Sequence, residues 1–233
     1  MSCSIPAIKG PLIRIPGDGA ALPLAESALI LAGGKGKRLG YDKKNIELLG
    51  VKVFDRIIQQ LRGVFREVLI SSNDPVEGYA VLPDALGSGP LAGIYQGLLR
   101  CSSEYLYVIA CDMPFISNNY IAYMKGILTG RRPHACVAGV SRSDPAAALE
   151  ASPPRNGCYE PMNAFYHKQC AAPMEAALRR GEYRIITSLE GLDIYAIPPE
   201  TLAAFGGGDL FFNINTVRDL ERAQRSRYDL SQN

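Results

Sequence analysis

Residues 27–44 read SALILAGGKGKRLGYDKK, in which a short apolar run leads directly into a glycine-rich basic loop. An apolar run of this length that ends at glycines is typical of a buried parallel strand. Glycines let the backbone approach an anion closely, and successive backbone N–H groups form a concavity that binds anions. We therefore expect Gly33, Gly34 and the cations that follow them to bind phosphates at the end of this strand.

Two well-known phosphate loops do not match this stretch. The dinucleotide pattern GxGxxG needs a glycine where this chain has Leu39. The Walker pattern, GxxxxGK followed by Ser or Thr, occurs nowhere in the sequence. A solvated basic turn stays open as the simpler alternative, although four glycines and five cations in residues 33–44 are more than a turn requires.

Strands and helices alternate along the rest of the chain. Apolar runs predict strands at residues 27–32, 67–72, 105–110, 134–139, 193–197 and 211–214. Helical spacing predicts helices at residues 91–101, 171–180 and 216–227, a helix marked by Phe54, Ile57, Ile58, Leu61 and Phe65, and a helix marked by Ile121, Met124 and Leu128 after Ser117. This alternation predicts an α/β fold, a single three-layer α/β/α domain with a mostly parallel, Rossmann-like sheet.

Prolines and glycines mark the limits of the predicted domain. They crowd residues 1–26, where we expect an irregular N-terminal extension, and the domain should then span residues 27–228. Residues 141–160 contain three prolines and little periodicity, so they are interpreted as a loop insertion. A capping pattern of Thr216 and Asp219 starts the last helix.

Composition excludes several classes of protein. The 233 residues carry a formal net charge of only +2, unlike the large basic excess of most nucleic-acid or membrane-surface binders. The sequence lacks the apolar run of about 18–20 residues that a membrane helix needs, and its start lacks a secretory signal, so we expect a cytoplasmic protein without nucleic-acid or membrane partners. Residues 33–44 alone carry five cations and one aspartate, so the balanced total hides one concentrated anion site.

The six cysteines are widely spaced and form no CxxC pair, and the chain has only two histidines to join them. We expect reduced, mostly structural thiols rather than a zinc site.

Four segments in a fixed order carry a resemblance to a known family. They are residues 31–43 (LAGGKGKRLGYDK), 84–93 (DALGSGPLAG), 110–115 (ACDMPF) and 212–216 (FNINT). Together they resemble the MobA-like family of nucleotidyltransferases, the molybdenum cofactor guanylyltransferases. The resemblance implies a fold of the nucleotide-diphospho-sugar transferase type. It also implies transfer of GMP from GTP to the phosphate of molybdopterin, with release of pyrophosphate.

Asp112 follows a predicted apolar strand, and Pro114 stops that strand from continuing. A carboxylate at the carboxyl end of a strand faces the crevice where open α/β sheets bind ligands. Mg²⁺ prefers carboxylate, phosphate and water oxygens. The resemblance implies that Asp112 is the Mg²⁺ ligand; its alternative is a simple cap on the next helix.

The resemblance also implies the residues that bind the nucleotide: Leu31, Ala32, Gly33, Gly34, Lys43, Ser71, Asn73, Asp84 and Asp112. Asp84 precedes a Gly-Ser-Gly-Pro turn, and a surface turn residue is its alternative. The family commonly carries an asparagine that contacts the purine base where this chain has Ser71, with Asn73 two residues later. Which of the two contacts the base stays open.

Asn213 and Asn215 are interpreted as residues that bind the acceptor. Alternate residues of a strand share a face, and neutral amides donate and accept at once, which suits the edge of a pterin ring. Related cytidylyltransferases tend to carry aspartate at both positions, so this segment favours the guanylyl type. A strand-end turn is the alternative. Residues 160–166 resemble the acceptor side of the family, and Arg179, Arg180 and Arg184 follow it, although a solvated helix end explains these arginines more simply.

In the reaction that the resemblance implies, Arg38, Lys43 and the Mg²⁺ at Asp112 offset negative charge on the transferring phosphate. The acceptor phosphate is already anionic, so no general base is required. GTP and molybdopterin are the expected substrates, and transient contacts with other proteins of molybdenum cofactor biosynthesis or with acceptor proteins are implied.

Three alternatives stay open at this point. The first is a related enzyme that uses CTP, as in molybdopterin cytidylyltransferase, or a sugar-phosphate acceptor. The second is a non-catalytic GTP-binding regulatory homologue. The third, a nicotinamide dehydrogenase, is disfavoured by Leu39 and by the cationic loop.

Overall fold

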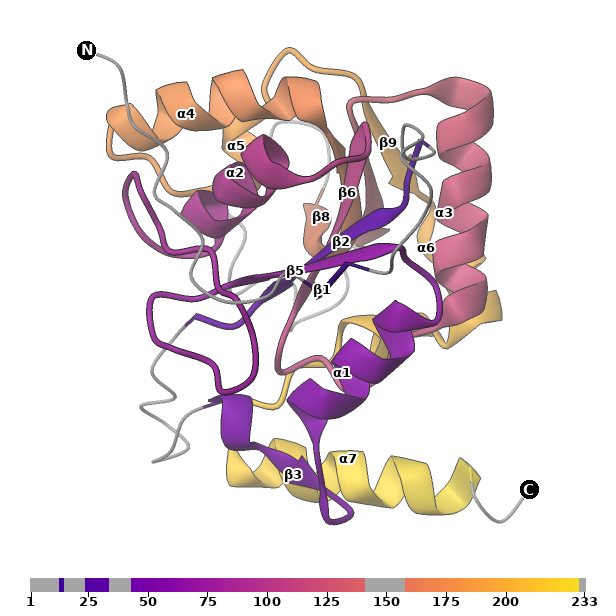
Figure 1. Cartoon of the computed structure of the whole chain (residues 1–233). Coiled ribbons are helices and arrows are strands. Elements are labelled where there is room, and N and C mark those ends of the chain that lie inside the picture. The colour runs from indigo at the N-terminus through magenta and orange to yellow at the C-terminus, as the bar shows by residue number, and fades with distance from the viewer. Residues whose placement is uncertain (1–12, 15–23, 34–42, 141–157, 231–233) are drawn as a thin grey trace.

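A central sheet organises the computed structural model, which describes residues 13–14, 24–33, 43–140 and 158–230 (Figure 1). Within these residues the sheet has seven strands in the order β1-β5-β2-β6-β8-β7-β9. The strands are β1 (Ile13–Arg14), β2 (Ser27–Leu31), β5 (Glu67–Ser71), β6 (Tyr105–Ala110), β7 (Ala135–Val140), β8 (Cys158–His167) and β9 (Ile194–Ile197). A separate small hairpin pairs β3 (Glu47–Leu48) with β4 (Val51–Lys52).

The sheet is mostly parallel, as predicted. β2 pairs in parallel with both β5 and β6, and β7 pairs in parallel with β9. β8 lies antiparallel between β6 and β7, and β1 is antiparallel to β5. The chain therefore passes from β2 to β5 on one side and then to β6 on the other. Ligands of open α/β sheets bind at the carboxyl ends of strands at such a reversal.

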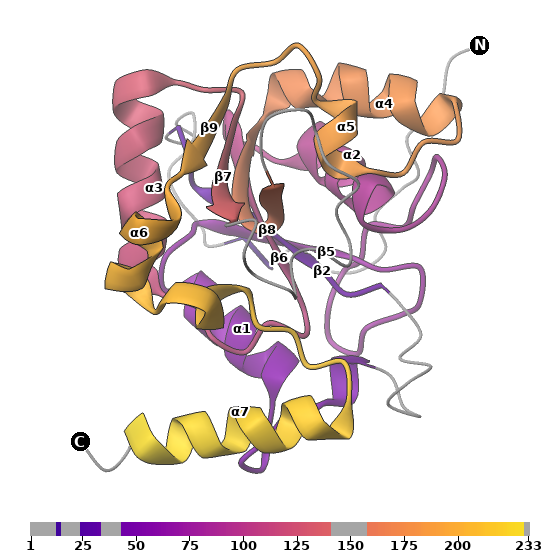
Figure 2. The same ribbon diagram turned by 180° about the vertical axis from the view of Figure 1, so that it is seen from behind.

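Helices cover both faces of the sheet, which makes three layers (Figures 1 and 2). α1 (Val53–Arg62) and α3 (Asn118–Arg131) share one apolar core with Ala28 and Ile30 of β2. α2 (Pro90–Arg100), α4 (Ala171–Arg179) and α5 (Ile185–Ser188) share the other core with Leu29 and Leu31. The two cores alternate along β2 because successive side chains of a strand point to opposite faces. α6 (Pro199–Leu202) and α7 (Val217–Leu230) complete the α-helices of the described chain.

Most predicted elements are confirmed to within two residues. Ser117 caps α3, since its side chain accepts a hydrogen bond from the backbone N–H of Tyr120. Thr216 and Asp219 exchange the predicted capping hydrogen bonds before α7. Phe65 is buried with the other apolar residues of its predicted helix but lies beyond the end of α1 at Arg62.

Two sequence-based assignments are wrong, and long-range contacts explain both. Residues 211–214 do not form a strand: a 3-10 helix, η5 (Gly207–Phe211), runs into irregular backbone. Residues 158–160 are not part of a loop but begin β8, which the sequence did not reveal as a strand; residues 141–157 lie outside the described residues. The two-residue strand β1, which pairs with β5, lies within the predicted N-terminal extension, and the irregular character of that extension stays a prediction.

Four cysteines of the described chain are buried and form no disulfide bond, as expected for structural thiols: Cys101, Cys111, Cys136 and Cys170. Burial raises the pKa of Cys101, Cys136 and Cys170 to about 12. No helix of the described residues is long and apolar enough to cross a membrane.

Candidate active site at the carboxyl edge of the sheet

Three strands end together at the reversal of strand order. Leu31, the last residue of β2, pairs with Ser71 of β5 and Ala110 of β6. Two hydrogen bonds extend this pairing past the strands, since Ala32 N donates to Ser71 O at 2.8 Å and Cys111 N donates to Leu31 O at 3.1 Å. The segments that begin with Gly33 and Asp112 therefore leave the sheet from the same edge, on neighbouring strands.

The basic loop leaves the sheet at this edge. Leu31 and Ala32 are buried, so the contribution predicted for them would have to come from their backbone, whereas Gly33 is exposed. Gly34 and Arg38 lie outside the described residues, and the chain resumes with a 3-10 helix, η1 (Lys43–Asn45). The predicted roles of Gly34, Arg38 and Lys43 stay predictions.

Asp112 is 5% exposed and stands where β6 ends. Its backbone oxygen accepts a hydrogen bond from Ile214 N at 3.0 Å, which joins two segments that lie about a hundred residues apart in sequence. The rings of Phe115 and Phe212 also meet, with centroids 5.8 Å apart. The structure thereby brings together the Asp112 segment and the Asn213–Asn215 segment, the two sides of the predicted reaction.

Asn73 and Asp84 form a reciprocal pair next to the end of β5. Asn73 Nδ2 donates to Asp84 Oδ2 at 3.0 Å, and Asp84 N donates to Asn73 Oδ1 at 2.8 Å. Leu82 holds this pair against the sheet, since its N–H donates to Ile70 O and its oxygen accepts from Ser72 N. Burial raises the pKa of Asp84, while the hydrogen bonds from Asn73 and from the backbone of Gly89 act in the opposite direction.

Ser71 is buried, and its side chain packs against the first turn of α2. A Cβ at Gly93 would lie 2.5 Å from Ser71 Oγ, so only glycine lets the helix approach this closely. The amide of Asn73 is engaged by Asp84. Contact of Ser71 or Asn73 with a base stays a prediction.

Asn213 and Asn215 stand on irregular backbone rather than on one face of a strand. Asn213 Nδ2 donates to Phe211 O at 3.1 Å. Asn215 N donates to Asp219 Oδ2 at 3.0 Å, so this asparagine sits at the entrance of α7. The alternation argument for a shared face therefore does not apply, although both side chains stay partly exposed.

Two of the predicted acceptor-side arginines pair locally with glutamates. Arg179 binds Glu175 one turn earlier on α4, with the shortest N···O distance at 2.6 Å, and Arg180 lies 3.7 Å from Glu182. These contacts support the simpler account of a solvated helix end.

Asn163 is a buried polar residue within residues 160–166, the stretch that resembles the acceptor side of the family, but the sequence analysis did not single it out. Its Oδ1 accepts from the Tyr107 hydroxyl at 2.5 Å, and its Nδ2 donates to Leu210 O at 3.0 Å. It has a left-handed φ of 53° within β8. The only local signal is an amide residue inside an otherwise apolar stretch, MNAFY, which does not distinguish a buried from an exposed position.

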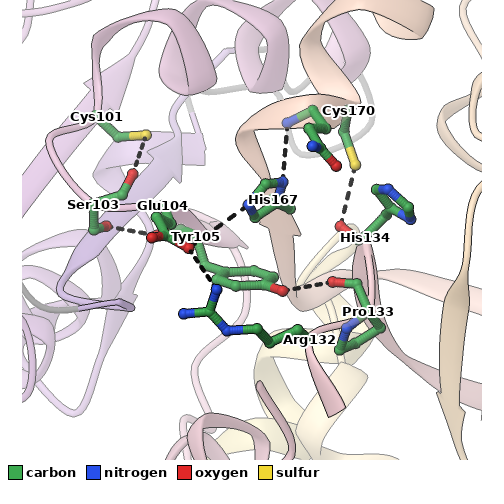
Figure 3. Close-up of polar contacts among 10 residues, drawn as sticks. Cys101, Ser103, Glu104, Tyr105, Arg132, Pro133, His134, His167 and Cys170 are labelled. Carbon is green, nitrogen blue, oxygen red and sulfur yellow. Dashed lines mark hydrogen bonds and ion pairs between the residues drawn. The ribbon is translucent and has the colours of Figure 1, made fainter. Parts of the chain in front are cut away.

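Both histidines of the chain lie at the opposite edge of the sheet, near the start of β6 (Figure 3). His167 Nδ1 accepts from Gln169 N at 3.2 Å, and His134 Nδ1 accepts from Asp193 N at 3.1 Å. Burial lowers the pKa of His167. Among the residues that the structure describes, no group of three or more His, Cys, Asp or Glu side chains gathers as metal ligands.

Comparison with known proteins identifies the family of this chain. Residues 28–192 match the family model of the MobA-like NTP transferase domain, which covers well over half of the chain. The chain belongs to the MobA-like family. Its MobA-like match begins within β2 and ends before β9, so Asp84 and Asp112 lie inside it and Asn213 and Asn215 lie beyond it.

Curated relatives extend the similarity over most of the chain. The molybdenum cofactor guanylyltransferase of Syntrophotalea carbinolica is 32% identical over 85% of this chain and 90% of its own length. A probable molybdenum cofactor guanylyltransferase of Natranaerobius thermophilus is 34% identical over 85% of this chain and 95% of its own length.

Solved structures show the same fold. Molybdopterin-guanine dinucleotide biosynthesis protein A from Archaeoglobus fulgidus superposes with a TM-score of 0.69 at 25% identity, over 87% of this chain and 99% of that one. The 2-C-methyl-D-erythritol 4-phosphate cytidylyltransferase of Thermus thermophilus superposes with a TM-score of 0.61 at 18% identity, over 87% of this chain and 98% of that one. The latter likeness concerns the fold alone.

Proposed function

We propose that this MobA-like protein is a molybdenum cofactor guanylyltransferase, which transfers GMP from GTP to the phosphate of molybdopterin and releases pyrophosphate. The observation that carries the proposal is the hydrogen bond from Ile214 N to Asp112 O. It brings the acceptor-side residues Asn213 and Asn215 to the strand end that carries Asp112, on the strand next to the one that leads into the glycine-rich loop. The names of the curated relatives support the choice of substrates.

In the proposed reaction, a phosphate oxygen of the acceptor attacks the α-phosphorus of GTP. A new P–O bond forms as the bond to the β-phosphate oxygen breaks, and pyrophosphate leaves with that oxygen. Backbone N–H groups of the loop from Gly33, together with Arg38 and Lys43, would hold the triphosphate and offset its charge. Asn73 and Asp84 would contact the nucleoside, and Asn213 and Asn215 would orient the acceptor. Positioning and electrostatics then supply the rate.

A divalent metal ion fits this donor set, and we propose Mg²⁺. Asp112 would supply a hard carboxylate oxygen, and Mg²⁺ commonly binds through one or two carboxylates plus substrate phosphates. Bound there, the ion would neutralise charge on the phosphate oxygens.

The test is a purified assay with GTP, Mg²⁺ and molybdopterin in which pyrophosphate and the guanine dinucleotide are both measured. Asp112→Asn should lower kcat by about 10² or more, the usual loss when one group that stabilises the transition state is removed. Asp55→Asn, an exposed carboxylate on α1, is the matched control and should keep full activity. Full turnover by Asp112→Asn would refute the assignment.

The same assay separates the alternatives. Turnover with CTP but not GTP would identify a cytidylyltransferase, and turnover only with a sugar phosphate would identify a different acceptor. Tight GTP binding without product at saturating molybdopterin would indicate a regulatory homologue.

A further inference from the structure

Two hydrogen bonds link the backbone of the acceptor-side segment, residues 207–215, to β8 and to the end of β6, and the side chains of Leu210 and Ile214 are buried in the apolar core. One is the hydrogen bond from Ile214 N to Asp112 O. In the other, the carbonyl of Leu210 accepts from Asn163 Nδ2 at 3.0 Å. Asn213 lies between Leu210 and Ile214, so the geometry of the two hydrogen bonds at these residues determines where its amide stands.

Asn163 sits in a bulge of β8. Cys136 pairs with Phe165 and Ala138 pairs with Glu160, so two steps along β7 match five steps along β8. Asn163 lies in the extra residues and adopts φ 53°, a left-handed conformation that asparagine tolerates better than most residues. Bulges and left-handed residues redirect side chains and cluster at functional sites.

The side chain of Asn163 links two parts of the candidate site. It is fully buried, and its amide uses both ends, as acceptor for Tyr107 on β6 and as donor to Leu210 in η5. Tyr107 lies on β6, and Asp112 follows two residues after the end of that strand. One amide therefore joins the strand that leads to Asp112 to the segment that carries Asn213.

We propose that Asn163 is a positioning residue for the acceptor: through Leu210 it holds Asn213 and Asn215 in place beside Asp112. The inference rests on the proposed function for the identity of the acceptor. Asn163 contacts neither substrate and acts only through the 207–215 segment.

Asn163→Gly tests the proposal without backbone strain, since glycine adopts a positive φ freely. Tyr107→Phe is the matched control, because it removes the other hydrogen bond of the same amide and leaves the bond to Leu210. If Asn163→Gly does not fold, Asn163→Asp replaces it in the test. The aspartate keeps an oxygen that accepts from the Tyr107 hydroxyl, and in its ionised form at alkaline pH it has no proton to donate to Leu210 O.

We expect Asn163→Gly to raise the KM for molybdopterin about tenfold, the factor that about 1.4 kcal/mol represents, with the KM for GTP unchanged. Tyr107→Phe should lower the melting temperature but leave the KM for molybdopterin and the KM for GTP unchanged. Equal rises in both KM values, an equal effect of Tyr107→Phe, or no change in Asn163→Gly would overturn the proposal.

Hydrogen exchange separates this inference from the proposed function. Amides of residues 208–215 should exchange faster in Asn163→Gly than in Tyr107→Phe, whatever the substrate. If wild-type protein transfers no GMP to molybdopterin, the proposed function fails, and this exchange result alone decides whether Asn163 holds the segment. Equal exchange in the two variants would show that it does not.

Discussion

Gly93→Ala should destabilise the protein even though alanine is the better helix former. Gly93 lies in the first turn of α2, where a Cβ would stand 2.5 Å from Ser71 Oγ and 2.8 Å from Leu31 Cδ2. Leu31 and Ser71 are both buried, and Ser71 Cβ would remain only 3.2 Å away after any rotation of the hydroxyl. The helix or the strand ends must therefore shift.

Overpacking of a filled core costs about 1–3 kcal/mol, and the higher helix propensity of alanine returns about 0.8–1.0 kcal/mol. Gly126 is the matched control within α3, since it is exposed and has no heavy atom within 4 Å of an added Cβ. Gly126→Ala should therefore gain only the stability that comes from the higher helix propensity of alanine. The free energies of unfolding of the two variants should therefore differ by about 1–3 kcal/mol. Each kcal/mol of this difference corresponds to about 2–4 °C in Tm for a protein of this size.

Urea denaturation of both variants beside wild type measures this difference. Leu31 leads into the glycine-rich loop and Ser71 leads to Asn73, both parts of the proposed nucleotide site, so their displacement should also raise the KM for GTP in Gly93→Ala only. A Gly93→Ala protein as stable as Gly126→Ala would refute the reasoning, since the close approach of α2 would then carry no energetic cost.

Three further outcomes follow from the pKa shifts. Burial raises the pKa of Asp84 above its ordinary 3.8, so its contribution to stability is present at acid pH and is lost as the pH rises through the folded pKa. Relative to Asp84→Asn, wild type should lose unfolding free energy in urea titrations as the pH rises above 3.8. Burial lowers the pKa of His167 below its ordinary 6.5, so its contribution to stability is present above that pH and is lost as the pH falls through the folded pKa. His167→Asn keeps a capping oxygen and should lose less unfolding free energy than wild type as the pH falls below 6.5; an equal loss would contradict the argument. The buried thiols of Cys101, Cys136 and Cys170 have raised pKa values and should not react with Ellman's reagent until the protein unfolds. Labelling of any of these three thiols in the native protein, mapped by mass spectrometry, would contradict their burial.

Local patterns predicted most of the fold because their physical causes are local. The apolar residues of β2, β5 and β6 form short continuous runs, as strands buried on both faces must. Capping at Ser117 and Thr216 depends on side chains within three residues of the backbone that they cap. Asp112 was placed at a strand end by the same reasoning, and the structure puts it there.

Residues 211–214 show where local reasoning fails. Two phenylalanines and an isoleucine favour a strand by propensity, yet this segment has one hydrogen bond to the sheet side, from Ile214 N to Asp112 O, in place of a ladder. Propensity does not decide here because Asp112 accepts from Ile214 N within the segment, and Asn163 donates to the oxygen of Leu210 immediately before it. No sequence pattern within the segment indicates that its hydrogen-bond partners are Asn163 and Asp112, which lie about fifty and about a hundred residues earlier in the chain.

The sequence by itself determined the class of the fold, the glycine-rich loop at the end of its first long strand, and Asp112 at the end of a neighbouring one, because apolar periodicity and glycine chemistry act over a few residues. Only the tertiary structure decided that β8 runs antiparallel, that Asn73 pairs with Asp84, and that Asn163 links β6 to the acceptor-side segment. These features depend on strand register and on hydrogen bonds between residues far apart in the chain. Their energies exist only once the chain has folded.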